Sequence, residues 1–154
     1  FERANTWYSS YGKSNEQVQI LIYLGRSYAN DGDYDKAMSI YTNALEIGEK
    51  NKLYNLVGYT YSYIGDLYRE KAIRTEAIKK YEMAADNFKK ENNIDSYTCA
   101  LRDMGREYAS IDSLSHAIEI LSTADSLTAK LQGHRCKSCH RQCFRKYLCN
   151  AKQI

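Results

Sequence analysis

Leu24-Gly25-Arg26-Ser27-Tyr28 is the stretch of sequence that decides the fold, because its spacing occurs three times. The apolar residue, the glycine and the tyrosine return as Ile64-Gly65-x-x-Tyr68 and again as Met104-Gly105-x-x-Tyr108, at one constant interval. Self-similarity at a fixed interval of this size is typical of proteins that stack copies of one small helical unit.

The residues around each motif follow the same interval. A large apolar residue or tyrosine precedes the motif, and an alanine, a further large apolar residue and a second alanine follow it. The three sets are Leu21, Ala37, Tyr41 and Ala44; Tyr61, Ala77, Tyr81 and Ala84; and Leu101, Ala117, Leu121 and Ala124. Within each set the spacing predicts two helices, each with one apolar side. The small residues let the two helices approach closely, and we expect the tyrosines to fill the space between neighbouring pairs.

A turn separates the two helices of each pair. Asn30-Asp31-Gly32-Asp33 is typical of such a turn, in which the glycine supplies a positive φ. One helical hairpin cannot bury its apolar side alone, so the hairpins must stack on one another.

These features resemble the tetratricopeptide repeat, in which leucine-glycine-x-x-tyrosine is followed by alanine-x-x-x-aromatic and a second alanine. Gly32-Asp33-Tyr34-Asp35-Lys36-Ala37 looks like the inter-helix turn of that family, and the resemblance covers roughly residues 18–131. It implies an all-α fold, a right-handed superhelical solenoid of antiparallel helix hairpins.

Two departures from the family pattern affect the expected helix lengths. The interval is 40 residues instead of about 34, and the chain contains no proline to close each repeat. We expect each second helix to run nearly two turns longer. Residues 1–131 should form about three hairpins after a leading half repeat, with residues 132–154 as a separate tail. The expected helices are 1–12, 17–30, 34–50, 53–71, 74–91, 94–110 and 114–131.

A narrower resemblance links three segments to the long-period repeats of Bacteroidetes regulatory proteins. The segments are Tyr23–Tyr28, Leu101–Tyr108 and Thr123–Leu127. It implies the sensory or docking region of a larger bacterial signal-transduction or transcription regulator, in the cytoplasm or the periplasm. Since the chain begins at Phe1 without an initiator methionine, we expect a fragment or a processed product.

The net charge of +3 divides unevenly along the chain. Residues 1–131 carry 16 basic and 19 acidic residues, whereas residues 132–154 carry six basic residues and no acidic one. No apolar run approaches the roughly 18 residues that span a membrane. We therefore expect no membrane contact within this fragment and no nucleic-acid binding through the array.

Residues that could catalyse a reaction are scarce. His116 is the only histidine before the tail, and no nucleophile can be paired with it from the sequence. Asp31 and Asp33 flank a turn and lack the further oxygen ligands of a calcium loop. The glycines form no phosphate-binding loop. We expect a non-enzymatic protein without a cofactor.

The resemblance also implies a binding surface, because the first helix of each hairpin lines the concave face where that family binds peptides. Arginine binds carboxylates with two hydrogen bonds and tyrosine packs at low entropic cost, so a protein or peptide segment with acidic groups fits. An output domain of the same parent protein is another such partner. In the alternative, the arginines pair with Asp66, Glu70 and Asp103 of the same face. The expected residues are Gln19, Tyr23, Arg26, Asn30, Tyr59, Tyr63, Asp66, Arg69, Arg102 and Arg106.

The tail contains a second candidate site. Cys136-Lys137-Ser138-Cys139-His140 fits the pattern of covalent haem attachment, and with Cys143 it offers four zinc ligands. The tail lacks the second ligand pair of a standard zinc site and the apolar residues of a haem pocket. No metal is therefore assigned, and a metal- or haem-binding protein stays the alternative function.

The origin of the tail stays open between two interpretations. The next hairpin would place a glycine at position 145, where the chain has Arg145. The tail is either the product of a shifted reading frame or a genuine basic extension that caps the last hairpin.

Overall fold

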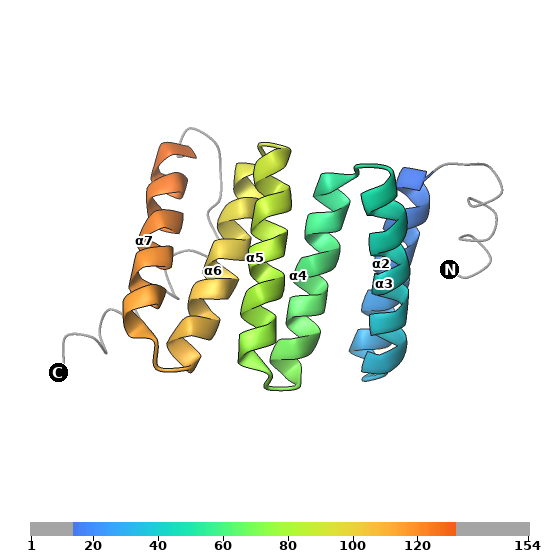
Figure 1. Cartoon of the computed structure of the whole chain (residues 1–154), viewed down its shortest axis with the longest axis horizontal. Helices are drawn as coiled ribbons and strands as arrows, with labels where there is room; N and C mark the ends of the chain where they lie inside the picture. The colour runs from blue at the N-terminus through green and yellow to red at the C-terminus, as the bar shows by residue number, and fades with distance from the viewer. Residues whose placement is uncertain (1–13, 132–154) are drawn as a thin grey trace.

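The computed structural model describes residues 14–131, which form helices and short turns without any strand. The helices are α2 (Ser14–Asn30), α3 (Tyr34–Lys50), α4 (Tyr54–Glu70), α5 (Arg74–Lys90), α6 (Ile94–Ser110) and α7 (Leu114–Leu131). In Figure 1 the helices follow one another along the long axis of the molecule, with α3 in front of α2 at one end and α7 at the other. Each helix packs against the next, so α2–α3, α4–α5 and α6–α7 are three stacked hairpins. The predicted helix at residues 1–12 and the tail lie outside the described residues.

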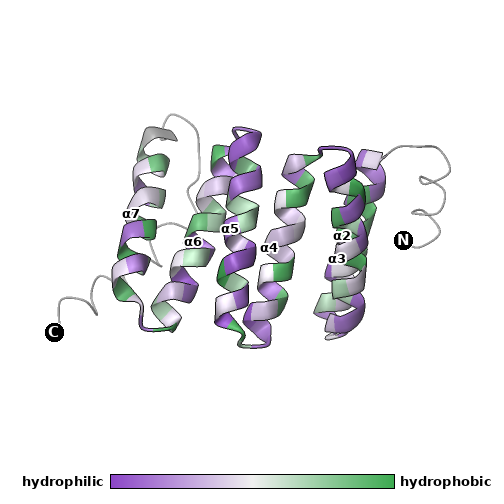
Figure 2. Ribbon diagram, in the orientation of Figure 1, coloured by the Kyte–Doolittle hydropathy of each residue, from purple (hydrophilic) through white to green (hydrophobic). Residues whose placement is uncertain are grey.

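The predicted all-α array of antiparallel hairpins is confirmed. The bounds of α3 to α7 agree with prediction to within one residue, and α2 begins three residues earlier than expected. Gly25, Gly65 and Gly105 occupy equivalent positions in α2, α4 and α6. Figure 2 shows apolar and polar residues intermixed along these helices, as their amphipathic patterns require.

The expectation that the second helix alone is longer is wrong. The first helices α2, α4 and α6 and the second helices α3 and α5 all have 17 residues. Compared with a 34-residue repeat, each helix with its turn therefore gains about three residues. Equal lengths let the paired helices cover each other from end to end, whereas a second helix longer by two turns would leave apolar residues without a neighbour.

The five turns share one backbone conformation and are evenly spaced along the chain. Their central residues have positive φ: Gly32 (81°), Lys52 (56°), Ala72 (58°), Asn92 (54°) and Asp112 (56°). The next residue donates its N–H to the carbonyl five residues back, for example Ile73 to Tyr68 at 2.9 Å. This Schellman arrangement satisfies the last carbonyls of each helix. The predicted turn at Gly32 is confirmed. The other four turns have four different residues at the same position, so no shared residue type predicts their conformation.

The close approach within each hairpin depends on the repeated glycine. A Cβ atom at Gly65 would lie 2.7 Å from Cε1 of Tyr81, and one at Gly105 would lie 2.8 Å from Cγ of Leu121. Gly25 meets the ring of Tyr41 in the same way. Each glycine therefore receives the large side chain at the matching position of the second helix in the same hairpin.

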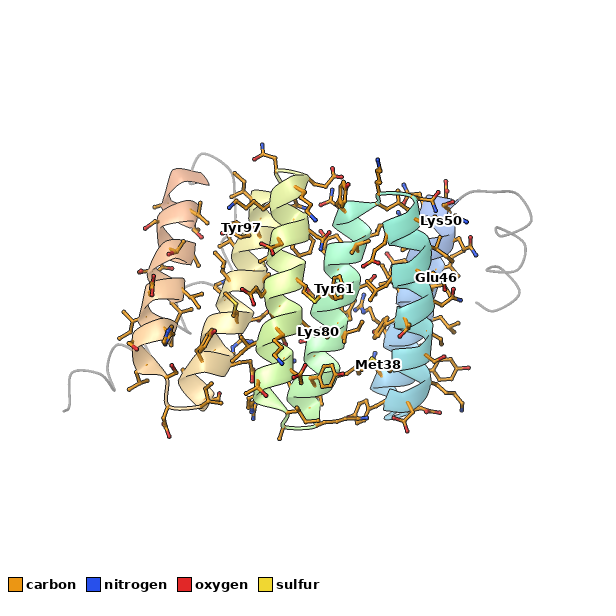
Figure 3. All side chains as sticks on the ribbon, viewed as in Figure 1. Met38, Glu46, Lys50, Tyr61, Lys80 and Tyr97 are labelled. Atoms are coloured by element: carbon orange, nitrogen blue, oxygen red, sulfur yellow. The ribbon has the colours of Figure 1, made fainter. Side chains whose placement is uncertain are left out.

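The ring that contacts Gly25 also contributes to the packing between hairpins. Tyr41 belongs to a buried cluster with Ile64 and Leu67 of α4, so it fills the inter-hairpin space as expected. Met38, labelled in Figure 3, packs against the same cluster. A second cluster joins Phe88 of α5 to Ala100 of α6.

A buried ion pair joins the second and third hairpins. Glu107 of α6 is 1% exposed, and Nη1 of Arg74 of α5 donates to its Oε2 at 2.8 Å. Removing one partner of such a pair leaves an uncompensated buried charge, so the pair fixes the position of α6 against α5.

Substituting Gly65→Ala should lower the free energy of unfolding by about 1–3 kcal/mol, because the added methyl group meets a ring that cannot move aside. Tyr81 is 0% exposed. Gly105→Ala is the matched control, since Leu121 is only partly buried and can shift, and its loss should be smaller. Urea denaturation measures both values. A Gly65→Ala variant as stable as the unmodified chain would contradict the close contact.

Substituting Ala72→Gly should raise the free energy of unfolding by about 0.5–1 kcal/mol. The left-handed conformation costs an L-residue about 1–2 kcal/mol, and part of the gain is offset by the flexibility of glycine in the unfolded chain. Asn92→Gly is the control, because asparagine tolerates this conformation. An Ala72→Gly variant that gains no more stability than Asn92→Gly would show that position 72 is unstrained.

Candidate peptide-binding face

The first helices of successive hairpins contact one another directly. Nδ2 of Asn93 donates to Oδ1 of Asn55 at 2.9 Å, and the hydroxyl groups of Tyr59 and Ser96 lie 2.8 Å apart. These contacts join α4 to the beginning of α6. The surface formed by α2, α4 and α6 on this side is here named the first-helix face, and it holds the predicted peptide-binding residues.

The part of this face nearest the N-terminus is aromatic. Tyr23 is 54% exposed and Tyr59 is 38% exposed. The guanidinium of Arg26 lies over the ring of Tyr63, 5.1 Å from its centroid. We call Tyr23, Arg26, Tyr59 and Tyr63 the aromatic half.

Two rings of the aromatic half are held by residues of the second helices. Tyr63 stacks on Tyr41 of α3 with centroids 6.0 Å apart, and Tyr59 packs edge-on against Phe88 of α5 at 4.9 Å. The rings of Tyr59 and Tyr63 are therefore held in position before a partner binds.

The part nearer the C-terminus is a network of charges. Nη1 of Arg69 lies 3.0 Å from Oδ1 of Asp66, and Nη1 of Arg106 lies 2.9 Å from Oδ1 of Asp103. Tyr81 donates its hydroxyl proton to Asp66 at 2.8 Å, and Arg69 donates to the same hydroxyl oxygen at 3.2 Å. The pairing that the sequence left open is thus present for Arg69 and Arg106, and these two arginines already have carboxylate partners.

Burial and neighbouring charges shift the pKa values of this network. Burial raises the pKa of the Asp103 carboxyl, Arg106 opposes the shift, and Asp66 adds to it. Burial and then Asp66 raise the pKa of Tyr81, so its hydroxyl keeps the proton that it donates to Asp66. Although burial disfavours its charge, Asp66 holds the pKa of Arg69 above its ordinary value. The carboxyl and guanidinium groups of this network therefore influence one another's pKa values.

The remaining predicted residues are less closely connected to these two groups. Nε2 of Gln19 donates to Oδ1 of Asn15 at 3.1 Å, and Nη2 of Arg102 lies 3.0 Å from Sγ of Cys99. Asn30 is exposed at the end of α2. The structure therefore brings Arg26 to Tyr63 and Arg69 to Asp66, but it places Gln19 and Asn30 at separate points of the face.

Sequence reasoning missed the residues that position this face from outside the first helices. Tyr81 and Phe88 come from α5, and the family pattern assigns second helices to the core. Pairing residues of successive first helices that are 37 positions apart would have predicted the contacts between these helices. This separation joins Tyr59 to Ser96 and Arg26 to Tyr63. That interval is slightly shorter than the repeat.

Other candidate sites find no support among residues 14–131. This part of the chain contains no group of three or more histidine, cysteine or acidic residues that could hold a metal ion. Nδ1 of His116 lies 2.9 Å from Oγ of Ser113, and its ring stacks on Tyr108 at 5.5 Å. Cys136, Cys139, His140 and Cys143 lie outside the described residues. None of the described helices is both long and apolar enough to pass through a bilayer.

Comparison with known proteins finds a similarity to one repeat family over part of the chain. A family model described as tetratricopeptide repeat matches residues 21–53. Over these residues the chain is similar to the tetratricopeptide repeat. This match covers α2 from Leu21 onward, α3 and the turns that follow them, and it includes the first copy of the glycine motif.

One relative and one solved structure extend the comparison. The chain is 33% identical over 81 residues to the photosystem I assembly protein Ycf3 of Acaryochloris marina (strain MBIC 11017), over 51% of this chain and 48% of that protein. It therefore spans about half the length of this relative. The crystal structure of BtubC (BKLC) from P. vanneervenii has a TM-score of 0.73 at 17% identity, over 90% of this chain and 57% of that one, which shows the fold alone. The narrower resemblance to Bacteroidetes regulators stays a prediction.

Proposed function

We propose that this array is a non-catalytic scaffold that binds a protein or peptide segment on its first-helix face. Tetratricopeptide repeats generally mediate interactions between proteins, and the relative from Acaryochloris marina is by name an assembly protein. The observation that carries the proposal is the aromatic half, where large side chains are exposed to solvent yet held in place by the core.

The aromatic half has the composition of a binding anchor. Tyrosine and arginine are enriched among the residues that contribute most to protein interfaces. Binding also costs about 0.5–1.5 kcal/mol for each flexible side chain that becomes fixed. Since Tyr59 packs on Phe88 and Arg26 lies over Tyr63, part of that ordering is already present in the unbound chain.

The charges of the face favour a particular partner chemistry. Arg69 and Arg106 are engaged by Asp66 and Asp103, so a partner carboxylate would have to compete with these aspartates. Arg26 is exposed and lies among tyrosines. We infer a partner segment that places an aliphatic or aromatic residue on Tyr23 and Tyr59 and an acidic group at Arg26.

The narrower resemblance supports a more specific role for such a scaffold. It favours the sensory or docking region of a larger bacterial regulator. In that setting the partner segment belongs either to a separate protein or to an output domain of the same parent protein.

Display of random peptides tests the proposal directly. We expect the unmodified chain to enrich peptides that combine an acidic residue with large apolar ones. The double variant Tyr23→Ser/Arg26→Glu should bind those peptides at least about tenfold more weakly, since losing one anchor of this kind costs more than about 1 kcal/mol. Circular dichroism should show unchanged helix content, because both side chains are exposed.

The matched control is Lys79→Glu/Met83→Ser on α5, which also reverses one charge and removes one exposed apolar side chain. It should bind the enriched peptides as the unmodified chain does. Equal weakening in both variants, or no enrichment by the folded chain, would exclude the first-helix face as the binding site.

A further inference from the structure

In a stack of hairpins, the side of each second helix that faces away from its own hairpin is covered by the next helix of the chain. In the stack, α4 packs on α3, and α6 packs on α5. Ala85 and Phe88 of α5 belong to one buried cluster with Ala100 of α6, and Arg74 of α5 bonds to Glu107 of α6. These positions on a second helix are therefore the ones that the following helix covers.

In the described part of the chain, the equivalent side of α7 is exposed near the start of the helix and half-buried further along. One repeat after Arg74, Ile78, Ala85 and Phe88 come Leu114, Ile118, Asp125 and Thr128, which we name the α7 outer face. Ile78 is 6% exposed, whereas Ile118 is 55% exposed and Leu114 is 45% exposed. Leu114 and Ile118 are one turn apart, so they form a single apolar patch.

We propose that residues 132–154 of this chain cover the α7 outer face. The chain continues directly from Leu131, the last residue of α7, just as it continues from Lys50 and Lys90, the last residues of α3 and α5, to the covering helices α4 and α6. In this array one helix with its turn takes up a stretch such as 54–73, and the segment 132–154 is slightly longer than that stretch. Its length is thus sufficient for one covering element.

Charge complementarity favours this occupant. Residues 111–129 contain Asp112, Glu119 and Asp125 and neither lysine nor arginine, while the segment has six basic residues and no acidic one. Opposite charges of this kind favour the correct docking arrangement over others.

The α7 outer face also differs from the surface that receives a regular hairpin. Where α5 has Ala85 and Phe88, α7 has Asp125 and Thr128. A further hairpin would bury this carboxylate in an apolar interface, which is costly. The basic segment brings cations to the same position, so it suits this face better than a regular hairpin does.

The segment also has apolar residues for Leu114 and Ile118. The sequence places Cys136, Cys139, Cys143 and Tyr147 at the spacing i, i+3, i+7 and i+11, which is the pattern expected of one side of a helix. Cysteine in its reduced form packs as a small apolar residue.

Thiol labelling of the full chain tests the proposal. Maleimide modification of Cys139 and Cys143 is followed by mass spectrometry in a reducing, chelator-treated buffer that is exchanged immediately before labelling. We expect Ile118→Asp to accelerate labelling of both cysteines at least about fivefold, because burying a new carboxylate under the segment is unfavourable. Met83→Asp is the matched control, since Met83 is 38% exposed on α5 outside this face, and it should leave the rates unchanged.

Three outcomes would overturn the proposal. In the first, both cysteines of the unmodified chain react as fast in buffer as they do in denaturant. In the second, Ile118→Asp and Met83→Asp give equal rates. In the third, analytical ultracentrifugation shows a dimer that Ile118→Asp dissociates without any change in labelling, which would assign the face to a second copy of the chain.

Discussion

The contact between a helix glycine and a ring of the partner helix is the constraint on which the rest of the structure depends. At Gly65 the absence of a Cβ atom lets Tyr81 rest against the backbone of α4, and Gly25 does the same for Tyr41. The contact sets the separation of the paired helices. It also determines the surface, because the hydroxyl of Tyr81 then reaches Asp66 and Arg69 on the first-helix face. One buried ring thus joins the core of a hairpin to the charges of its exposed side.

The identical turns make the hairpins stack in a regular array. Because every turn has the same conformation and every helix from α2 to α6 has 17 residues, successive hairpins repeat the same arrangement. The first helices then meet at intervals of 37 residues, which aligns Arg26 with Tyr63 and Tyr59 with Ser96. The exposed aromatic half is a consequence of this stacking, and the pair of Arg74 and Glu107 strengthens it between the second and third hairpins.

The helices were predictable from the sequence because glycine, alanine and the large apolar residues recur at one interval. In every copy the small residues receive the large side chains of the neighbouring helix. The equal length of the two helices in each repeat could not be predicted, since the period fixes only the sum of the two helix lengths. The places of the other four turns were predicted from the helix bounds. Their shared conformation was not, because Lys52, Ala72, Asn92 and Asp112 have no side-chain property in common that marks it. On the candidate site, the sequence named the residues of the first-helix face. It left open whether Arg69 and Arg106 face solvent or a neighbouring aspartate, because that depends on side-chain orientation within one helical turn.

A double-mutant cycle between positions 65 and 81 tests the central contact most directly. Tyr81→Val removes the ring atoms that approach Gly65, namely Cε1, Cδ1 and Cζ. The free energy of unfolding is measured for Gly65→Ala, Tyr81→Val and the combined variant. The contact predicts that Gly65→Ala costs less in the valine background, with a coupling energy of about 1 kcal/mol or more. Additive effects of the two substitutions would contradict it.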